Sequence, residues 1–137
     1  MQGISKKRWG RWVVALSFGF AAGAALADDA IPESNPYSGD EKAMREGKSW
    51  YRGVCAACHG GRADGAGERG NGADLRKFEL GFKGFVHVVL EGRQQPGRTM
   101  AMPAWKGVLK NDDIYKIGAY LETMAIEGAN WKEGNRH

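Results

Sequence analysis

The sequence has 137 residues, a pI of about 9.2 and a formal net charge of +4, from 20 Lys and Arg against 16 Asp and Glu. Four of the basic residues and none of the acidic ones lie before residue 28, so the rest of the chain is formally neutral. The basic pI therefore gives no reason to expect nucleic acid or an anionic membrane as a partner.

Residues 1–27 have the form of a cleaved secretory signal. A cationic stretch precedes an apolar run from Trp12 to Ala25, and Ala25-Leu26-Ala27 is an A-x-A cleavage site. The run is shorter than a membrane-spanning helix requires, so we expect export to the periplasm. An uncleaved anchor is the alternative, and only then is a membrane partner expected. Residues 28–137 remain, which is the size of one small domain, and we expect a monomer.

The first predicted helix follows an extended lead-in. Residues 28–37 show no periodic pattern, whereas Ser38 and Glu41 have the spacing of a capping box, which predicts a helix over residues 39–53. Its apolar and small residues share one face: Ala43, Gly47, Trp50, Tyr51 and Val54. Because glycine lowers helix propensity, Gly47 on this face predicts the close approach of another backbone.

Cys55 and Cys58, followed at once by His59, have the spacing of the attachment motif for c-type haem. Each thiol can add to one vinyl group of the porphyrin, which brings the histidine under the iron as an axial ligand. A thiol redox centre would leave His59 unused, and a zinc site would need a second cluster of ligands. We therefore predict one covalent haem c, with thiol redox chemistry, copper and other metal binding as the alternatives.

Six glycines between residues 60 and 72 predict a loop that turns tightly around one edge of the haem. A phosphate-binding loop is disfavoured because the Gly-Lys-Ser/Thr ending is missing. Residues 74–78 predict a helical turn, and apolar residues spaced from Phe82 to Leu90 predict a second helix that stops at Gly92. His87 falls on the polar side of that helix, so we expect it to be solvent-exposed.

Pro96 and Pro103 predict an irregular segment over residues 93–105, which holds Met100 and Met102. Methionines beside a proline in an extended loop, with no helical stripe to join, favour one of them as the sixth ligand of haem iron. The candidates to neutralise or hydrogen-bond the haem propionates are Trp105, Arg93, Arg98, Arg62 and Gln94.

A last helix is predicted from Asn111 to a stop near Gly128, with a buried stripe made of Ile114, Ile117, Gly118, Leu121, Met124 and Ala125. Within this stripe, Gly118 predicts a close crossing with the first helix at Gly47. The tail, residues 128–137, contains Trp131, which either folds back on the domain or forms a partner surface. No segment alternates with a period of two, so we expect an all-α domain with long loops.

The chain resembles class I monohaem cytochromes c over residues 38–127. The resemblance rests on Cys55-Ala56-Ala57-Cys58-His59-Gly60, on Met102-Pro103-Ala104-Trp105 and on Tyr120-Leu121 in the last helix. It implies the small cytochrome fold, in which the first and last helices cross and loops surround one covalent haem. The family's distal methionine directly precedes the proline, which implies Met102 as the distal ligand and Met100 as the second choice.

The chain departs from this family at one position. Many members have a proline whose carbonyl accepts a hydrogen bond from the proximal histidine, whereas Ala73 takes that place here. Any residue supplies a carbonyl, but the loop without proline is less stiff and so holds the acceptor that orients His59 less firmly.

The carboxy-terminal stretches Ile117 to Thr123 and Gly128 to Lys132 are similar to those of small cytochromes that accept electrons from quinone-dependent methanol or other alcohol dehydrogenases. Iron held in six-coordination by His59 and Met102 predicts a one-electron carrier, not an enzyme. The carboxy-terminal likeness implies such a dehydrogenase as donor, with a terminal oxidase or another cytochrome as acceptor. The alternative is a haem c protein whose labile sixth ligand allows gas binding or peroxide chemistry.

Overall fold

The computed structural model describes residues 30–70, 72–97 and 99–132, so the predicted signal lies outside the described residues. The elements in chain order are α1 (Glu41–Val54), α2 (Ala56–His59), the 3₁₀ helix η1 (Leu75–Lys77), α3 (Gly81–Glu91) and α4 (Asn111–Glu122). The described ranges contain three isolated β-bridges and no strand, so the all-α prediction is confirmed. Within the same ranges, no helix has both the length and the apolarity needed to cross a bilayer.

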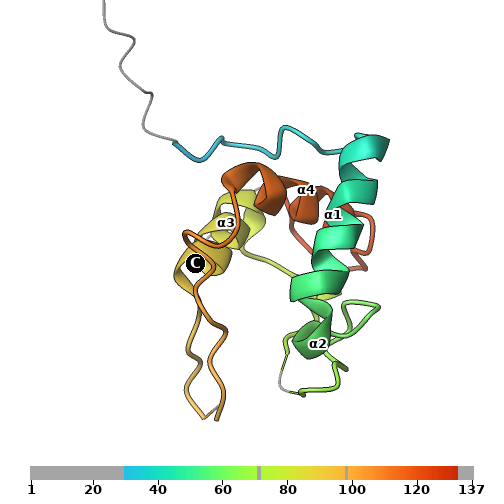
Figure 1. Ribbon diagram of the computed structural model, residues 1–137. Coiled ribbons are helices and arrows are strands. Elements are labelled where there is room, and N and C mark those ends of the chain that lie inside the picture. Colours follow the sequence, from blue (N-terminus) through green and yellow to red (C-terminus); the bar gives the residue numbers. More distant parts are fainter. Residues whose placement is uncertain (1–29, 71, 98, 133–137) are drawn as a thin grey trace, which may run out of the picture.

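Helices α1 and α4 cross closely at Gly47, as predicted (Figure 1). A Cβ atom on Gly47 would lie 1.9 Å from the carbonyl oxygen of Lys116 and 2.9 Å from the backbone nitrogen of Ile117. No side chain fits between the helices at this point, because the obstacle is backbone and cannot rotate away. The absence of a side chain at Gly47 therefore sets how closely the two helices approach.

The predicted partner of Gly47 is wrong, because Gly118 faces away from α1. A Cβ atom on Gly118 would lie 3.1 Å from the side-chain nitrogen of Asn35 and 3.2 Å from the ring of Phe85. The small residue thus makes room for α3 and for the lead-in rather than for the helix crossing. Helical spacing places Gly118 on the buried side of α4 but does not say which neighbour covers it.

The start of α1 also differs from the prediction. Asp40 is the N-cap, and its carboxylate accepts a hydrogen bond from the backbone N–H of Ala43 at 2.8 Å. The Ser38 hydroxyl donates instead to Glu122 at 2.6 Å, so the predicted capping box does not form. Aspartate caps as well as serine, which leaves Ser38 free to tie the lead-in to the end of α4.

One residue of the predicted buried face of α1 is exposed. Ala43, Gly47 and Tyr51, each four positions apart, are buried, and Val54 is half-buried. Trp50 lies at the edge of this stripe and is 40% exposed, so its prediction as a core residue is wrong. The narrow stripe matches the single partner helix, because α4 covers only one side of α1.

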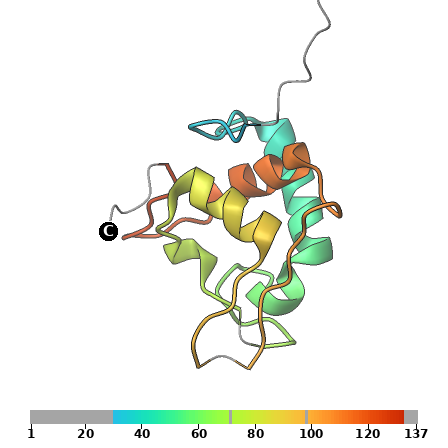
Figure 2. The same cartoon turned by 90° about the vertical axis from the view of Figure 1, so that its left-hand side faces the viewer.

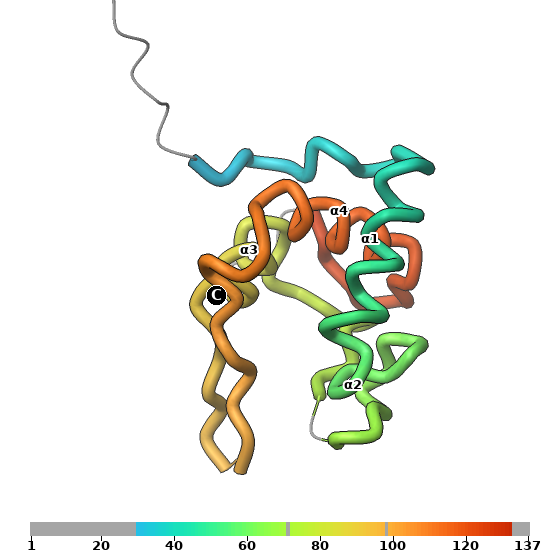
Figure 3. The backbone as a smooth tube through the Cα atoms, viewed as in Figure 1, coloured from blue at the N-terminus to red at the C-terminus, as the bar shows by residue number. Residues whose placement is uncertain are grey.

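The lead-in forms a strap along α4 and is not a free arm (Figure 3). Asn35 is buried, and its side-chain amide donates to the carbonyl of Tyr115 at 3.0 Å and to Glu122 at 3.2 Å. The Tyr37 hydroxyl donates to Asp112 at the start of α4. These bonds bring residues that precede α1 into the packing of the last helix.

Charged side chains link α1 and α4 near the same crossing. The ammonium group of Lys116 lies 2.9 Å from Glu46 of α1 and 2.7 Å from Asp112 of α4. Hydrogen bonding to Lys116 lowers the pKa of both carboxyls, and the two carboxylates raise the pKa of Lys116. The network joins the first and last helices at the rim of their crossing.

The predicted buried face of α3 is confirmed at Phe82, Phe85, Val86 and Val89, with Leu90 half-buried. His87 is exposed, as predicted. Figure 2 shows α3 lying against α4, on the side away from α1. The core thus lies between three helices, and its largest fully buried side chains are Tyr51, Phe82, Ile114, Ile117, Leu121 and Val86.

The last helix ends at Glu122, before the predicted stop at Gly128, so Met124 is only half-buried and Ala125 is exposed. The carbonyl of Tyr120 accepts the hydroxyl of Thr123 at 2.6 Å and its backbone N–H at 3.1 Å, which closes the last turn of the helix. The chain beyond α4 turns back onto the domain instead of continuing as a helix.

Trp131 folds back on the domain, which resolves the choice that the sequence left open. It is 5% exposed, and its ring centroid lies 4.7 Å from that of Phe78 and 5.3 Å from that of Phe85. The backbone N–H of Asn130 donates to the carbonyl of Phe78 at 2.8 Å. The tail therefore completes the core beside η1 and α3.

Candidate functional site

The Cys-x-x-Cys-His motif occupies one turn of helix directly after α1. Cys55 is the C-cap of α1, and its carbonyl accepts the backbone N–H groups of Cys58 at 3.1 Å and of His59 at 3.0 Å. Both cysteines are free and half-buried. A short helical turn thus holds the two thiols and the histidine together, as the motif requires.

The ring of His59 is oriented by a backbone carbonyl. Its Nδ1 lies 3.0 Å from the carbonyl oxygen of Ala73, the residue that the sequence placed at this point. Because a carbonyl can only accept, Nδ1 carries the proton, and the lone pair of Nε2 is left for a metal. The predicted use of the Ala73 carbonyl is confirmed.

The backbone of the glycine-rich loop packs directly against the backbone of the motif. A Cβ atom on Gly72 would lie 2.1 Å from the carbonyl oxygen of Cys58, and one on Gly67 would lie 2.4 Å from that of Ala57. Only glycine allows backbone to approach backbone this closely. The loop therefore fixes the position of the His59 backbone.

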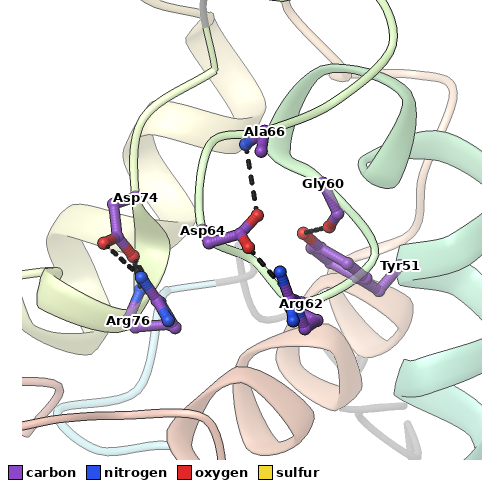
Figure 4. A network of polar contacts seen from close by, with 7 residues as sticks. All are labelled: Tyr51, Gly60, Arg62, Asp64, Ala66, Asp74 and Arg76. Carbon is purple, nitrogen blue, oxygen red and sulfur yellow. Dashed lines mark hydrogen bonds and ion pairs between the residues drawn. The ribbon is translucent and has the colours of Figure 1, made fainter.

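Polar side chains brace this loop (Figure 4). The buried hydroxyl of Tyr51 donates to the carbonyl of Gly60 at 2.6 Å, which pins the end of α2 to α1. Asp64 accepts from the N–H of Ala66 at 3.2 Å and pairs with Arg62 at 3.3 Å. A second acidic–basic pair, Asp74 with Arg76, lies further along the loop (Figure 4).

Sequence reasoning included Arg62 as a candidate propionate contact, but it did not include Asp64, Asp74 or Arg76 in the site. The available signal was the repeated spacing of an aspartate two positions from an arginine, in Arg62-Ala63-Asp64 and in Asp74-Leu75-Arg76. The arginine lowers the pKa of Asp74 mainly through its hydrogen bonds, so this carboxylate stays charged at neutral pH.

Met102 lies on an arm formed by the irregular segment between α3 and α4. The backbones of Arg93 and Met102 are paired, with N–H···O distances of 3.0 and 2.9 Å, and the Trp105 N–H donates to Val89 of α3 at 2.9 Å. The arm and α2 extend from the same end of the helical core in both ribbon views (Figures 1 and 2).

The structure separates the two methionines. Met102 is half-buried and packs against the core, whereas Met100 is 49% exposed near the tip of the arm. A soft thioether that faces the core is better placed as an interior ligand than one in water. The assignment of Met102 as a ligand stays a prediction that this placement supports.

The described candidate propionate contacts lie on two segments, the arm and the glycine-rich loop. Trp105 is half-buried against the core, and Arg93 is exposed on the arm. Arg62 is exposed on the glycine-rich loop, where it pairs with Asp64, and Gln94 is exposed on the arm. Arg98 lies outside the described residues.

The residues of the motif fit a covalent haem better than the alternatives. Burial raises the pKa of Cys55 to about 12, with a smaller contribution from Cys58, so this thiol is protonated at neutral pH. In the described part of the chain, no three His, Cys, Asp or Glu side chains gather as a metal site. Thiols on one turn, a histidine with free Nε2 and half-buried apolar neighbours suit a porphyrin.

One further hollow is unrelated to the motif. A cavity of about 710 Å³ is lined by the lead-in, the end of α3 and the start of α4, with Ile31, Leu90 and Leu109 among its walls. None of the predicted ligands lines it.

Comparison with known proteins is consistent with this geometry. Residues 42–121 match the family described as cytochrome c oxidase, cbb3-type, subunit III. Cytochrome c6 of Anabaena variabilis is 34% identical over 79 residues, which are 57% of this chain and 85% of that protein. The cbb3-type cytochrome c oxidase subunit CcoP of Azospirillum sp. (strain B510) is 31% identical over 99 residues, or 70% of this chain, which spans 33% of that subunit.

Two solved structures share the fold. Cytochrome CL from the marine methylotrophic bacterium Methylophaga aminisulfidivorans MPT has a TM-score of 0.55 and 23% identity, over 82% of this chain and 74% of that one. The c-type cytochrome XoxG from Methylobacterium extorquens AM1 has a TM-score of 0.52 and 18% identity, over 68% of this chain and 57% of that one. The TM-scores show a common fold, and at identities this low the likeness shows no more than that.

Proposed function

This chain belongs to the cytochrome c family that includes subunit III of cbb3-type oxidases, and from that premise we propose that it is a one-electron carrier whose haem iron is held by His59 and Met102. Membership implies one covalent haem c, and Cys55 and Cys58 are the only cysteines in the chain. The two thiols are therefore assigned to the thioether bonds.

The chain's own residues orient the two axial ligands. The Ala73 carbonyl holds the proton of His59 on Nδ1, so Nε2 would be the atom that holds the iron, and this hydrogen bond makes the imidazole a stronger donor. Met102, whose backbone is paired with that of Arg93, would supply the thioether ligand. When bound, the haem supplies a reversible one-electron couple, whose potential a methionine ligand raises.

The observation that carries the proposal is the placement of these two ligand segments. The His59 segment is braced from behind by the glycine-rich loop, and the Met102 arm is hydrogen-bonded to α3 through Trp105. Ligands held by separate rigid segments need little rearrangement when an electron arrives or leaves. Such pre-organisation suits electron transfer better than the binding of an exogenous ligand.

Carbon monoxide distinguishes an electron carrier from a gas-binding or peroxidatic protein. We expect the purified holoprotein to titrate as a single one-electron couple, and its ferrous spectrum to remain unchanged under carbon monoxide at pH 7, because Met102 occupies the sixth position. The measurement is a potentiometric titration followed by absorption spectra with and without the gas. A high-spin ferric spectrum, or ready carbon monoxide binding, would favour the alternative with a labile sixth ligand.

The partners we propose follow from the likeness of residues 117–123 and 128–132, and the proposed compartment follows from the predicted signal. The protein acts in the periplasm, with a quinone-dependent methanol or other alcohol dehydrogenase as donor and an oxidase or another cytochrome as acceptor. The origin of a cytochrome of the same fold in a methylotrophic bacterium supports the donor, and the CcoP relative, a subunit of an oxidase, supports the acceptor.

The donor is tested by steady-state reduction. We expect a purified quinone-dependent methanol dehydrogenase and methanol to reduce the ferric holoprotein within the turnover time of the enzyme, recorded as the rise of the ferrous α band. A mixture without methanol serves as the control. If reduction with methanol is no faster than in this control, the dehydrogenase is not the donor, while the carrier function remains.

A further inference from the structure

The carbonyl that orients His59 belongs to a residue without intrinsic stiffness. A proline at position 73 would fix its own backbone angle φ through its ring, whereas Ala73 leaves φ free. The hydrogen bond from Nδ1 of His59 to this carbonyl is nevertheless formed at 3.0 Å. Other contacts must therefore hold the peptide in place.

The next residue carries the strongest of these contacts. The Asp74 carboxylate accepts two hydrogen bonds from the guanidinium of Arg76, one from Nε and one from Nη2, both at 2.9 Å. It also accepts the backbone N–H of Arg76 at 3.1 Å, which begins η1. A bidentate pair of this kind adds geometric specificity as well as attraction.

Asp74 controls the Ala73 carbonyl through one peptide plane. The carbonyl of Ala73 and the N–H of Asp74 belong to the same planar group, so holding Asp74 restricts the direction of that oxygen. Neighbouring backbone also limits this plane, because a Cβ atom on Gly65 would lie 3.3 Å from the carbonyl carbon of Ala73 and 3.3 Å from the backbone nitrogen of Asp74.

We propose that Asp74 and Arg76 form a positioning pair that replaces the stiffness of a proline and holds the Ala73 carbonyl on the Nδ1 proton of His59. Through this bond the pair sets how strongly the imidazole donates to the iron, and so acts on the reduction potential from outside the ligand set. The inference rests on His59 being the proximal ligand.

The chain supplies a matched control on α1, outside the glycine-rich loop and the ligand segments. Arg45 pairs with Glu41 at 3.6 Å, and its side chain is 71% exposed. In contrast, the Arg76 side chain is 32% exposed and binds in two places. Arg76→Lys and Arg45→Lys both keep the net charge and replace a guanidinium with an ammonium group, and only the first changes the support of Ala73.

The test follows the Nδ1 proton of His59 in the ferrous holoprotein by NMR hydrogen exchange. We expect this proton to exchange about three- to fivefold faster in Arg76→Lys, because local opening of the loop becomes easier, and to exchange at the wild-type rate in Arg45→Lys. The midpoint potential should rise in Arg76→Lys alone, since a weaker hydrogen bond makes histidine a poorer donor to ferric iron.

A second variant makes the test independent of general loop damage. Adding Ala73→Pro to Arg76→Lys should return the exchange rate and the potential towards wild type, because the ring restores the missing stiffness. The proposal is overturned by an unchanged exchange rate in Arg76→Lys, by an equal change in Arg45→Lys, by faster exchange without a shift in potential, or by no recovery with proline.

Failure of the proposed function would be visible separately. In the ferrous wild type, ring protons of an axial histidine are displaced strongly upfield by the porphyrin ring current. If the protons of His59 lack this displacement, the histidine is not the ligand and the proposed ligation fails, whatever the variants of Arg76 show.

Discussion

Met102→Ala should abolish the far-red methionine–iron absorption band of the ferric holoprotein, whereas Met100→Ala should keep it. Met102 is half-buried against the core on a hydrogen-bonded arm, and Met100 is 49% exposed, so only the first removes a thioether held close to the interior. The midpoint potential of Met102→Ala should fall because a soft ligand that favours ferrous iron is lost. Absorption spectra and potentiometric titration of both variants provide the measurement.

Met100→Ala also serves as the matched control for this ligand assignment. It removes the same side chain from the same arm and leaves the backbone pairing of Arg93 with Met102 intact. Loss of the band in Met100→Ala and its retention in Met102→Ala would reverse the assignment. Retention in both variants would show that neither methionine is the ligand.

Gly47→Ala should destabilise the protein by about 3 kcal/mol, since its added methyl group would overlap backbone atoms of the partner helix. That Cβ atom would lie 1.9 Å from the carbonyl oxygen of Lys116, so α1 and α4 would have to separate along their shared core. Denaturant unfolding of the holoprotein, followed by far-UV circular dichroism, measures the loss.

Gly53→Ala on the same helix is the control for the close approach at Gly47. A Cβ atom on Gly53 would have nothing within 4 Å, so alanine should stabilise the protein by about 0.5–1 kcal/mol through its higher helix propensity. Equal effects of the two substitutions would refute the close crossing at Gly47.

Local patterns predicted the helices and the attachment motif well, because the physics behind them is local. The spacing from Phe82 to Leu90 indicates the buried face of α3, and Cys55 to His59 span a single turn. The use of the Ala73 carbonyl was also predictable, because a proximal histidine needs an acceptor and the loop offers one nearby.

Choices among competing partners were not predictable in the same way. Ser38 could cap α1, but Asp40 does so, because the Ser38 hydroxyl finds Glu122 at the end of α4. Gly118 lies on the buried side of its helix, yet only the folded chain shows that Phe85 uses the space. Such outcomes depend on contacts between residues far apart in the sequence, where several local solutions have similar energies.

The bracing of the site shows the same limit. The Asp74–Arg76 spacing is visible in the sequence, but its relation to His59 appears only when the loop brings Ala73 onto the imidazole. The ligand role of Met102, the domain boundaries and the cleavage of residues 1–27 stay predictions. They depend on chemistry and processing that a fold alone does not determine.

The strap formed by the lead-in lies at the opposite end of α1 from Cys55, which matters when the molecule is immobilised. The strap meets α1 at its first turn, and Cys55 follows its last, so the 14 residues of the helix separate them by roughly 20 Å. A tether attached ahead of the strap therefore leaves the Cys55 end pointing away from the point of attachment. A molecule immobilised on an electrode at the start of the strap would keep the end that carries Cys55 open to a soluble redox partner.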